Sequence, residues 1–271
     1  MIKGLLKKSI AILTVGILTV SLTACSKGGT TVEDITSAKK LVIGTSADFP
    51  PYEFHKEING KDTIVGFDIA IGQAIAEELG VDVEIKDMDF DGLLAALSAG
   101  TIDVVMAGMN PTPEREESVD FTDIYYYAEQ TVLVRAEDAD KYTSVDSLAG
   151  LKVAAQKGTI QESLVTEQID GAEVVALAKI PDLVLQLKSG KVEAIAVESA
   201  VAESYAKANS DLVVGSFQFE VAEEEKGAAI AVKEGSDELI EKLNEILAKL
   251  IKEGKIDQFV VEANEMVEVE E

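Results

Sequence analysis

Residue types that bind metals, form disulfides or act in catalysis are scarce in this chain of 271 residues. It has one cysteine, one histidine and no tryptophan. A lone cysteine cannot form an internal disulfide, and one histidine with one cysteine cannot build a His/Cys metal cluster. A Ser-His-Asp triad would depend on His55 alone. We therefore expect no metal ion, no cofactor and no catalytic residue of these kinds.

Basic residues are also few. The chain carries 24 Lys and Arg against 50 Asp and Glu, which gives a formal net charge of −26 and a pI near 4.3. A net negative charge of this size repels phosphate backbones, so the sequence predicts no binding to nucleic acid. Hydrophobic residues at 47% and charged residues at 27% are typical of a globular protein. The length fits one large domain or two of medium size.

The N-terminal segment has the pattern of an export signal. Three lysines precede an apolar run at 10–20, which is shorter than the roughly 20 residues needed to span a bilayer. The single cysteine, Cys25, directly follows Leu22-Thr23-Ala24. This arrangement resembles a bacterial lipobox, which implies a signal peptide at 1–24 and lipidation of Cys25. A plain signal peptide followed by an incidental cysteine is the alternative.

Processing at Cys25 would change both the charge and the location of the protein. Removal of residues 1–24 takes away three lysines and no acidic residue, so the net charge becomes −29. Lipid chains on Cys25 would hold the protein at an outer membrane face. Residues 25–37 are mostly small and polar, which predicts a flexible tether. We thus expect an exported, membrane-anchored protein.

Beyond the tether, short apolar runs alternate with amphipathic segments. Strands are predicted at 41–44, 81–85 and 102–107, with helices at 68–79 and 91–99 between them. The same order then recurs, with strands at 152–155, 173–176 and 192–197 and helices at 161–168 and 181–189. Strands that alternate with helices of about ten residues predict parallel α/β units.

The two series also match each other in sequence. At an offset of ninety positions, residues 92–108 align with residues 182–198, with leucines and a glycine in common. Coincidence between two generic α/β units is the alternative to a real repeat. A real repeat predicts two similar lobes, one from 38–127 and 226–271 and the other from 128–225. Ligands bind outside the carboxyl ends of strands in open α/β sheets, so two facing lobes would form a cleft.

Arg115 lies in a loop that follows one of the predicted strands. The loop contains Gly108, Asn110 and two prolines, so it is irregular and exposes backbone N–H groups. A guanidinium matches a carboxylate through two parallel hydrogen bonds. Pairing of Arg115 with Glu114 or Glu116 on the surface is the alternative.

Other strand ends carry complementary groups. Phe49 and Phe90 follow two strands and could flank an apolar stem, although packing at a loop base is the alternative. Thr159 opens a helix, where free N–H groups favour an anion. Glu198 would meet an ammonium, and the alternative is that it is a solvated acid or a helix N-cap partner. An anion site, a cation site and an apolar stem together describe an α-amino acid that is held rather than converted.

Several motifs resemble those of one family. The matching stretches are 49–54, 65–70, 107–115, 119–122, 125–126, 156–159 and 194–199. On these stretches the chain resembles the polar amino-acid-binding lipoproteins of bacterial ABC importers, solute-binding protein family 3. The resemblance implies an α/β, two-lobed periplasmic binding protein-like fold with the ligand between the lobes. It also implies a monomer that delivers its ligand to permease subunits.

The resemblance assigns site residues by position. Arg115 would grip the α-carboxylate, Gly108 would lend its carbonyl to the ammonium, and two phenylalanines would flank the side chain. The full set of implied ligand-binding residues is Ser46, Phe49, Tyr52, Phe90, Gly108, Met109, Asn110, Thr112, Arg115, Gln156, Thr159, Ile160 and Glu198.

Two of these positions depart from the family pattern, and a third lacks an acidic residue that only some relatives carry. Glu198 stands where Asp is usual, Asn110 where Ser or Thr is common, and Ser46 where some relatives carry an acid that meets basic side chains. The sequence therefore leaves the bound amino acid open. A dehydratase-like enzyme on the same scaffold and a tethered amino-acid sensor are the rival functions.

Overall fold

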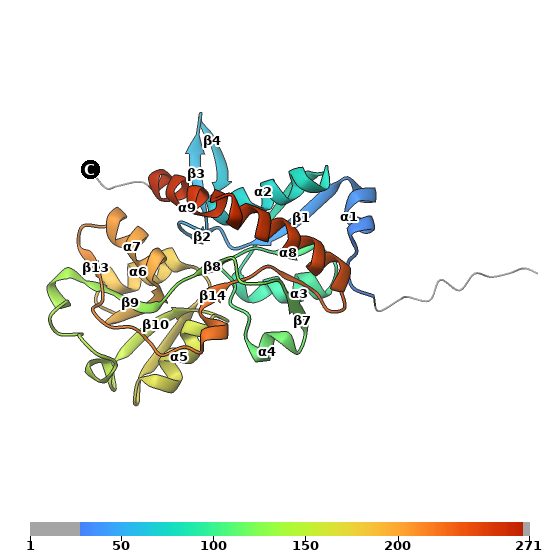
Figure 1. The fold of residues 1–271 in the computed structure, drawn as a ribbon. Helices are drawn as coiled ribbons and strands as arrows, with labels where there is room; N and C mark the ends of the chain where they lie inside the picture. The colour runs from blue at the N-terminus through green and yellow to red at the C-terminus, as the bar shows by residue number, and fades with distance from the viewer. Residues whose placement is uncertain (1–27, 268–271) are drawn as a thin grey trace, which may run out of the picture.

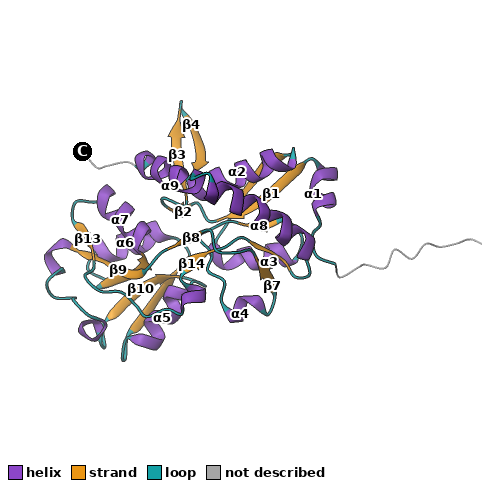
Figure 2. Cartoon of the chain, in the orientation of Figure 1, coloured by secondary structure: helices purple, strands orange, loops and turns teal. Residues whose placement is uncertain are grey.

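A computed structural model of the protein describes residues 28–267 (Figures 1 and 2). Two groups of strands, each flanked by helices, form two lobes. The predicted signal peptide, the predicted lipidation site Cys25 and the first residues of the predicted tether lie outside the described residues. The mixed α/β, two-lobed architecture predicted from the sequence is confirmed.

The sheet of lobe 1 contains five strands. In spatial order they are β5 (Asp82–Asp87), β1 (Lys40–Thr45), β6 (Val104–Val105), β15 (Ala231–Lys233) and β7 (Val119–Phe121). The first three are parallel, and β15 runs antiparallel to both of its neighbours. A small antiparallel sheet of β2 (Asp48–Phe49), β3 (Glu53–Ile58) and β4 (Lys61–Val65) projects beside it (Figure 1).

The sheet of lobe 2 repeats this pattern with different strands. Its order is β11 (Glu173–Leu177), β10 (Lys152–Gln156), β12 (Ala194–Glu198), β9 (Gln130–Arg135) and β13 (Leu212–Val214). Again the first three are parallel, and the fourth runs antiparallel to both neighbours. Each lobe thus has the same arrangement of parallel and antiparallel strands.

Helices bury apolar faces against both sheets. Those of lobe 1 are α1 (Val32–Ala38), α2 (Phe67–Leu79), α3 (Leu93–Ser98), α4 (Pro113–Glu116), α8 (Asp237–Lys252) and α9 (Lys255–Met266). Those of lobe 2 are α5 (Ile160–Gln168), α6 (Ile180–Lys188) and α7 (Ser199–Ala208). Helix α8 buries five apolar side chains at the spacing of one helical face. Short 3-10 turns are η1 (Phe90–Gly92), η2 (Ala136–Asp138), η3 (Val145–Leu148) and η4 (Glu223–Glu225).

The internal repeat is confirmed in three dimensions. Residues 92–108 and 182–198 each contain a helix, a turn and a central strand. The Asp103 carboxylate accepts the backbone N–H of Val42, and the Glu193 carboxylate accepts that of Lys152. Asp103 and Glu193 therefore have the same structural role, because each accepts a backbone N–H of the neighbouring parallel strand.

The chain passes between the two sheets twice, and the two passages lie side by side. Strand β8 (Tyr126–Tyr127) leads from lobe 1 to lobe 2, and β14 (Gly227–Ala228) leads back. They pair with each other as an antiparallel two-stranded sheet. The C-terminal segment then returns to lobe 1, where β15 lies between β6 and β7 in the sheet.

Helix α1 occupies part of the segment predicted as a flexible tether. The Thr31 side chain accepts the Asp34 N–H and the Asp34 carboxylate accepts the Thr31 N–H, so the helix begins with a capping box. Ile35 packs into the core with 1% of its surface exposed. The tether prediction is therefore wrong for residues 32–37, because a cap and one buried side chain fix this short helix.

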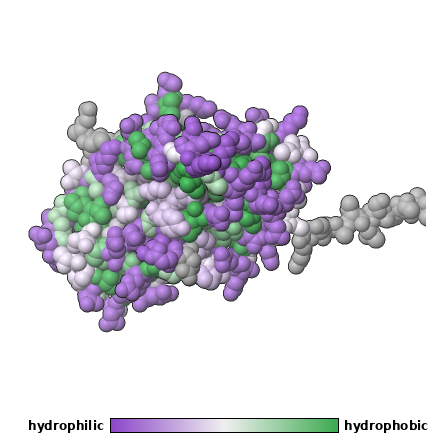
Figure 3. Space-filling view, viewed as in Figure 1, coloured by the Kyte–Doolittle hydropathy of each residue, from purple (hydrophilic) through white to green (hydrophobic). Residues whose placement is uncertain are grey.

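Hydrophilic side chains cover most of the face shown in Figure 3, including the region over α8 and α9. No helix within residues 28–267 is both long and apolar enough to cross a bilayer. In the same part of the chain, no three His, Cys, Asp or Glu side chains are grouped so that they could hold a metal ion.

Candidate functional site

A small cavity lies between the lobes, at the carboxyl ends of their central strands. Its lining contains seven of the predicted site residues, namely Ser46, Phe49, Phe90, Gly108, Asn110, Gln156 and Thr159. Glu53, Ala107 and Gln161 also line it, and the sequence did not predict these three. The structure therefore brings together strand ends from both lobes around one cavity.

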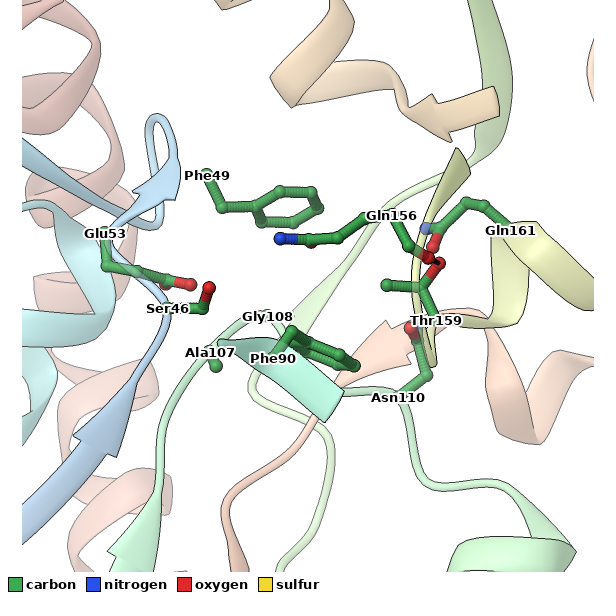
Figure 4. A pocket seen from close by; sticks show the side chains of 10 residues that line it. All are labelled: Ser46, Phe49, Glu53, Phe90, Ala107, Gly108, Asn110, Gln156, Thr159 and Gln161. Carbon is green, nitrogen blue, oxygen red and sulfur yellow. Dashed lines mark hydrogen bonds between the residues drawn. The ribbon is translucent and has the colours of Figure 1, made fainter. Parts of the chain in front are cut away.

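The cavity has two chemically different ends (Figure 4). The rings of Phe49 and Phe90 lie on opposite sides of the space. Glu53 lies toward one end, whereas Asn110 and Thr159 lie toward the other. The two ends therefore differ, with a carboxyl group at one and neutral polar groups at the other.

Arg115 is held at the polar end by backbone groups. Its Nη1 donates to the Asn110 carbonyl at 2.7 Å, and its Nη2 donates across the cleft to the Gly158 carbonyl at 3.1 Å. The guanidinium carbon lies 5.4 Å from the Phe90 ring centroid. Burial lowers the pKa of Arg115 to about 10. Within residues 28–267 no carboxylate pairs with this guanidinium, so its surface pairing with Glu114 or Glu116 is not observed.

The local sequence explains why Arg115 points inward. Helix α4 begins with Pro113, and the Thr112 hydroxyl accepts the backbone N–H of Arg115 at 3.3 Å. A threonine cap and a proline in the first turn are strong helix-start signals. Thr112 and Ile160 line an outer groove together with Arg115, rather than the cavity.

The beginning of helix α5 faces Arg115 from lobe 2. The Thr159 hydroxyl donates to the Gln156 carbonyl at 2.7 Å and does not cap the helix. The first N–H groups of α5 are therefore not occupied by its own N-cap side chain. Such a helix start, beside a buried guanidinium, is suited to a carboxylate.

Gly108 is fixed in place by a buried aspartate. Asp68 accepts the Gly108 N–H at 2.9 Å and the Tyr125 hydroxyl at 2.7 Å. Burial raises the pKa of Asp68 to about 6, in spite of these two donors. Gly108 has a φ of +56°, and a Cβ there would lie 2.9 Å from the Phe49 ring. Both the backbone conformation and the packing therefore require glycine at this position.

Glu198 lies behind the cavity lining rather than in it. Its Oε1 accepts from Gln130 at 3.2 Å and more weakly from Asn110 at 3.5 Å. The residue is fully buried, and burial raises its pKa to about 7 in spite of the neighbouring donors. Tyr52 and Met109 are likewise buried, outside the cavity lining.

Glu53 is the notable residue that the sequence did not predict as a ligand contact. It is fully buried, and neither of its carboxylate oxygens has a hydrogen-bond partner among residues 28–267. Burial, followed by the nearby carboxylates Asp68, Asp48 and Glu198, raises its pKa well above the ordinary value. A sequence signal existed, because Glu53 stands between two aromatic residues in an otherwise apolar stretch.

The charges buried around the cleft are unequal. Four buried carboxylates lie there, on Asp48, Glu53, Asp68 and Glu198. Arg115 is the one buried basic side chain in the described part of the chain. Burial raises the pKa of all four carboxyl groups, so a ligand with more positive than negative groups would favour their charged forms.

Comparisons with known proteins agree with this geometry. Residues 41–262 match the model of bacterial extracellular solute-binding proteins, family 3. The arginine-binding extracellular protein ArtP of Bacillus subtilis is 36% identical over 255 residues, which cover 93% of this chain and 96% of ArtP.

Solved structures give the same result. AbpA from Streptococcus pneumoniae, an amino acid ABC transporter substrate-binding protein bound to L-arginine, is 37% identical with a TM-score of 0.85, over 88% of this chain and 100% of AbpA. The ancestral amino-acid-binding protein AncCDT-1, a precursor of cyclohexadienyl dehydratase, is 36% identical with a TM-score of 0.77, over 85% and 98%. The chain belongs to the bacterial extracellular solute-binding proteins of family 3, and it is an amino-acid-binding component of an ABC importer.

Proposed function

We propose that this protein captures a basic amino acid, L-arginine in particular, and delivers it to its permease. The observation that carries this proposal is Glu53, a fully buried carboxylate that lines the cavity with no partner among the described residues. A guanidinium between the Phe49 and Phe90 rings would meet that carboxylate through two parallel hydrogen bonds. The arginine named for ArtP and AbpA supports the same ligand.

The α-carboxylate and α-ammonium would occupy the other end of the cavity. Arg115 and the start of helix α5 would receive the carboxylate. The Gly108 carbonyl, oriented by Asp68, would accept the ammonium, and Glu198 would supply the countercharge from behind. The ligand's two positive groups and one negative group would then reduce the excess of buried negative charge.

Release would require the lobes to separate. Arg115, Asn110 and Gln156 each reach across the cleft to a residue of the other lobe. The paired crossings β8 and β14 are the natural hinge, because they are the segments that join the two sheets. A ligand that touches both lobes favours the closed state through contacts it makes only there.

Anchoring and assembly complete the proposal. Lipidation of Cys25 would tether the exported protein to the membrane beside its permease. The protein would act as a monomer and as a binder rather than an enzyme. The kinship with AncCDT-1 makes catalysis on this scaffold the rival, in which Glu198 would serve as a general acid.

A thermal-shift screen of the full-length mature protein tests the ligand directly, because a ligand that binds only the folded state raises the melting temperature. The twenty amino acids, ornithine and citrulline would each be added at one concentration. Arginine is expected to give the largest shift, and citrulline, which has the same shape without the charge, a much smaller one. A larger shift from a neutral amino acid would refute the proposal. Arginine incubated with the protein should be recovered unchanged by NMR, which would distinguish binding from catalytic turnover.

A further inference from the structure

Asp48 stands at the junction of the two lobes. It lies on β2, one residue before Phe49, and its side chain is buried. The hydroxyl of Tyr205, on α7 of lobe 2, donates to the Asp48 carbonyl at 2.8 Å. Both the backbone and the side chain of this residue are therefore engaged across the cleft.

The Asp48 carboxylate caps a helix of the opposite lobe. Helix α6 begins at Ile180, and its own N-cap residue, Lys179, provides no side-chain cap. The backbone N–H of Ile180 instead donates to Asp48 Oδ2 at 2.9 Å. A carboxylate at a helix start satisfies a free N–H group and interacts favourably with the helix dipole.

The same carboxylate also holds two residues that line the cavity. The Gln156 side-chain amide donates to Asp48 at 3.3 Å, and it also donates to the Ala178 carbonyl at 2.9 Å. The Ser46 hydroxyl donates to Asp48 at 3.2 Å. Asp48 thus connects a helix of lobe 2, a cavity-lining residue of lobe 2 and a cavity-lining residue of lobe 1.

We propose that Asp48 is a positioning residue that favours the closed arrangement of the lobes for every amino acid the protein binds. It contacts α6 and Gln156 only when the lobes meet, so its contacts differ between the open and closed states. Its described contacts are with protein groups, so its loss should weaken every ligand, and a cationic ligand should lose somewhat more because Asp48 also lies among the carboxylates near Glu53. This inference rests on the proposed lobe closure, but not on arginine as the ligand.

Replacement of Asp48 by alanine would leave buried donors unsatisfied in the closed state. The Ile180 N–H would lose its partner, and the Gln156 amide would lose one of two acceptors. In the open state water can reach these groups, so the cost falls on closure alone. Apparent affinity falls in proportion to the closed population, so Asp48→Ala should weaken every ligand by about tenfold.

An exposed contact between the lobes offers a matched control. Asp91 of lobe 1 pairs with Lys157 of lobe 2 at 2.7 Å, with 31% and 60% of the side chains exposed. Exposed ion pairs contribute little, so Asp91→Asn should change affinity by less than about threefold. Asp48→Asn keeps one oxygen for the Ile180 N–H and should fall between wild type and Asp48→Ala.

The test is calorimetry and stopped-flow dissociation with L-arginine, L-lysine and L-citrulline on wild type, Asp48→Ala, Asp48→Asn and Asp91→Asn. The expected result is a loss of affinity for every ligand in Asp48→Ala, somewhat larger for arginine and lysine than for citrulline, with faster dissociation. Thermal melting without ligand identifies a variant that fails to fold, in which case Asp48→Asn decides the question with a smaller loss for every ligand.

Three results would overturn the inference. These are unchanged affinity in the Asp48 variants, a loss confined to one ligand, and an equal loss in Asp91→Asn. If wild type binds none of the three amino acids, the proposed arginine function fails. The same variants are then compared with whichever amino acids the thermal-shift screen identifies, so the role of Asp48 is decided separately.

Discussion

The two lobes have the same strand arrangement but bring different chemistry to the cleft between them. Lobe 1 supplies both aromatic rings, the buried guanidinium of Arg115 and the carboxyl group of Glu53, which has no hydrogen-bond partner among residues 28–267. Lobe 2 lines the cavity with neutral polar side chains, those of Gln156, Thr159 and Gln161. The two lobes thus share one strand arrangement but differ in the side chains they bring to the cleft. The reason is that these side chains lie in the segments that follow the strands.

This difference suggests a division of labour. In the proposed complex, charged groups buried in lobe 1 would select the charges of the ligand, since their burial makes an unmatched partner costly. Lobe 2 contributes amides, a hydroxyl and a helix start, which complete hydrogen bonds when the lobes meet. Glu198, at the end of the central strand of lobe 2, is the exception, because it is a buried acidic residue in the lobe that otherwise contributes neutral groups.

Replacing one arginine in each lobe should give the largest difference in ligand affinity between the two lobes. Arg115→Ala is expected to cost about 2–5 kcal/mol of arginine binding, because the ligand carboxylate loses its charged partner. Arg135→Ala is the control, since Arg135 of lobe 2 donates to the Leu187 and Val192 carbonyls and does not line the cavity. Calorimetry on folded variants measures both. Equal losses in the two variants would contradict the division of labour.

Glu198 provides the next largest effect, on stability rather than binding. Its native pKa of about 7 exceeds its ordinary value of 4.5, so the native state keeps the proton that the unfolded state releases. This group therefore lowers the free energy of unfolding as pH rises from about 5 to 8, by about 3 kcal/mol. Glu198→Gln should remove that part of the pH dependence in urea titrations without ligand. A variant with the wild-type pH dependence would show that Glu198 is not buried as described.

A smaller effect is expected from the aromatic face contributed by lobe 1. Phe90 lies over the Arg115 guanidinium, and in the proposed complex it also flanks the ligand side chain. Phe90→Leu should weaken arginine binding by about 1 kcal/mol, because leucine has no aromatic face for a cation. Phe219→Leu, in the core of lobe 2, should lower the melting temperature but leave affinity unchanged. A greater loss of affinity in Phe219→Leu than in Phe90→Leu would contradict the assignment of Phe90 to the ligand site.

Much of the fold followed from the sequence because its signals are local. Regular alternation of strands and helices predicted both sheets, and the match between 92–108 and 182–198 predicted their similarity. Helix α1 was missed because a capping box and one buried isoleucine outweigh a polar composition. Such tertiary burial is not visible in a short polar segment.

The site was predicted in part for a similar reason. Seven cavity residues follow strand ends, where the fold class places ligands. Glu53 begins the hairpin strand β3, so a search of strand ends passed over it. Its lack of a hydrogen-bond partner among the described residues depends on the folded surroundings, which no local pattern records.

Glu53 gives the most direct test of the central claim. Arginine and citrulline have nearly the same shape, but only arginine carries a cationic tail. Titration calorimetry of wild type and Glu53→Gln with both ligands isolates the interaction with that tail. We predict that Glu53→Gln weakens arginine binding by about 2–5 kcal/mol and changes citrulline binding little. Equal changes for the two ligands, or an unchanged affinity for arginine, would contradict the account.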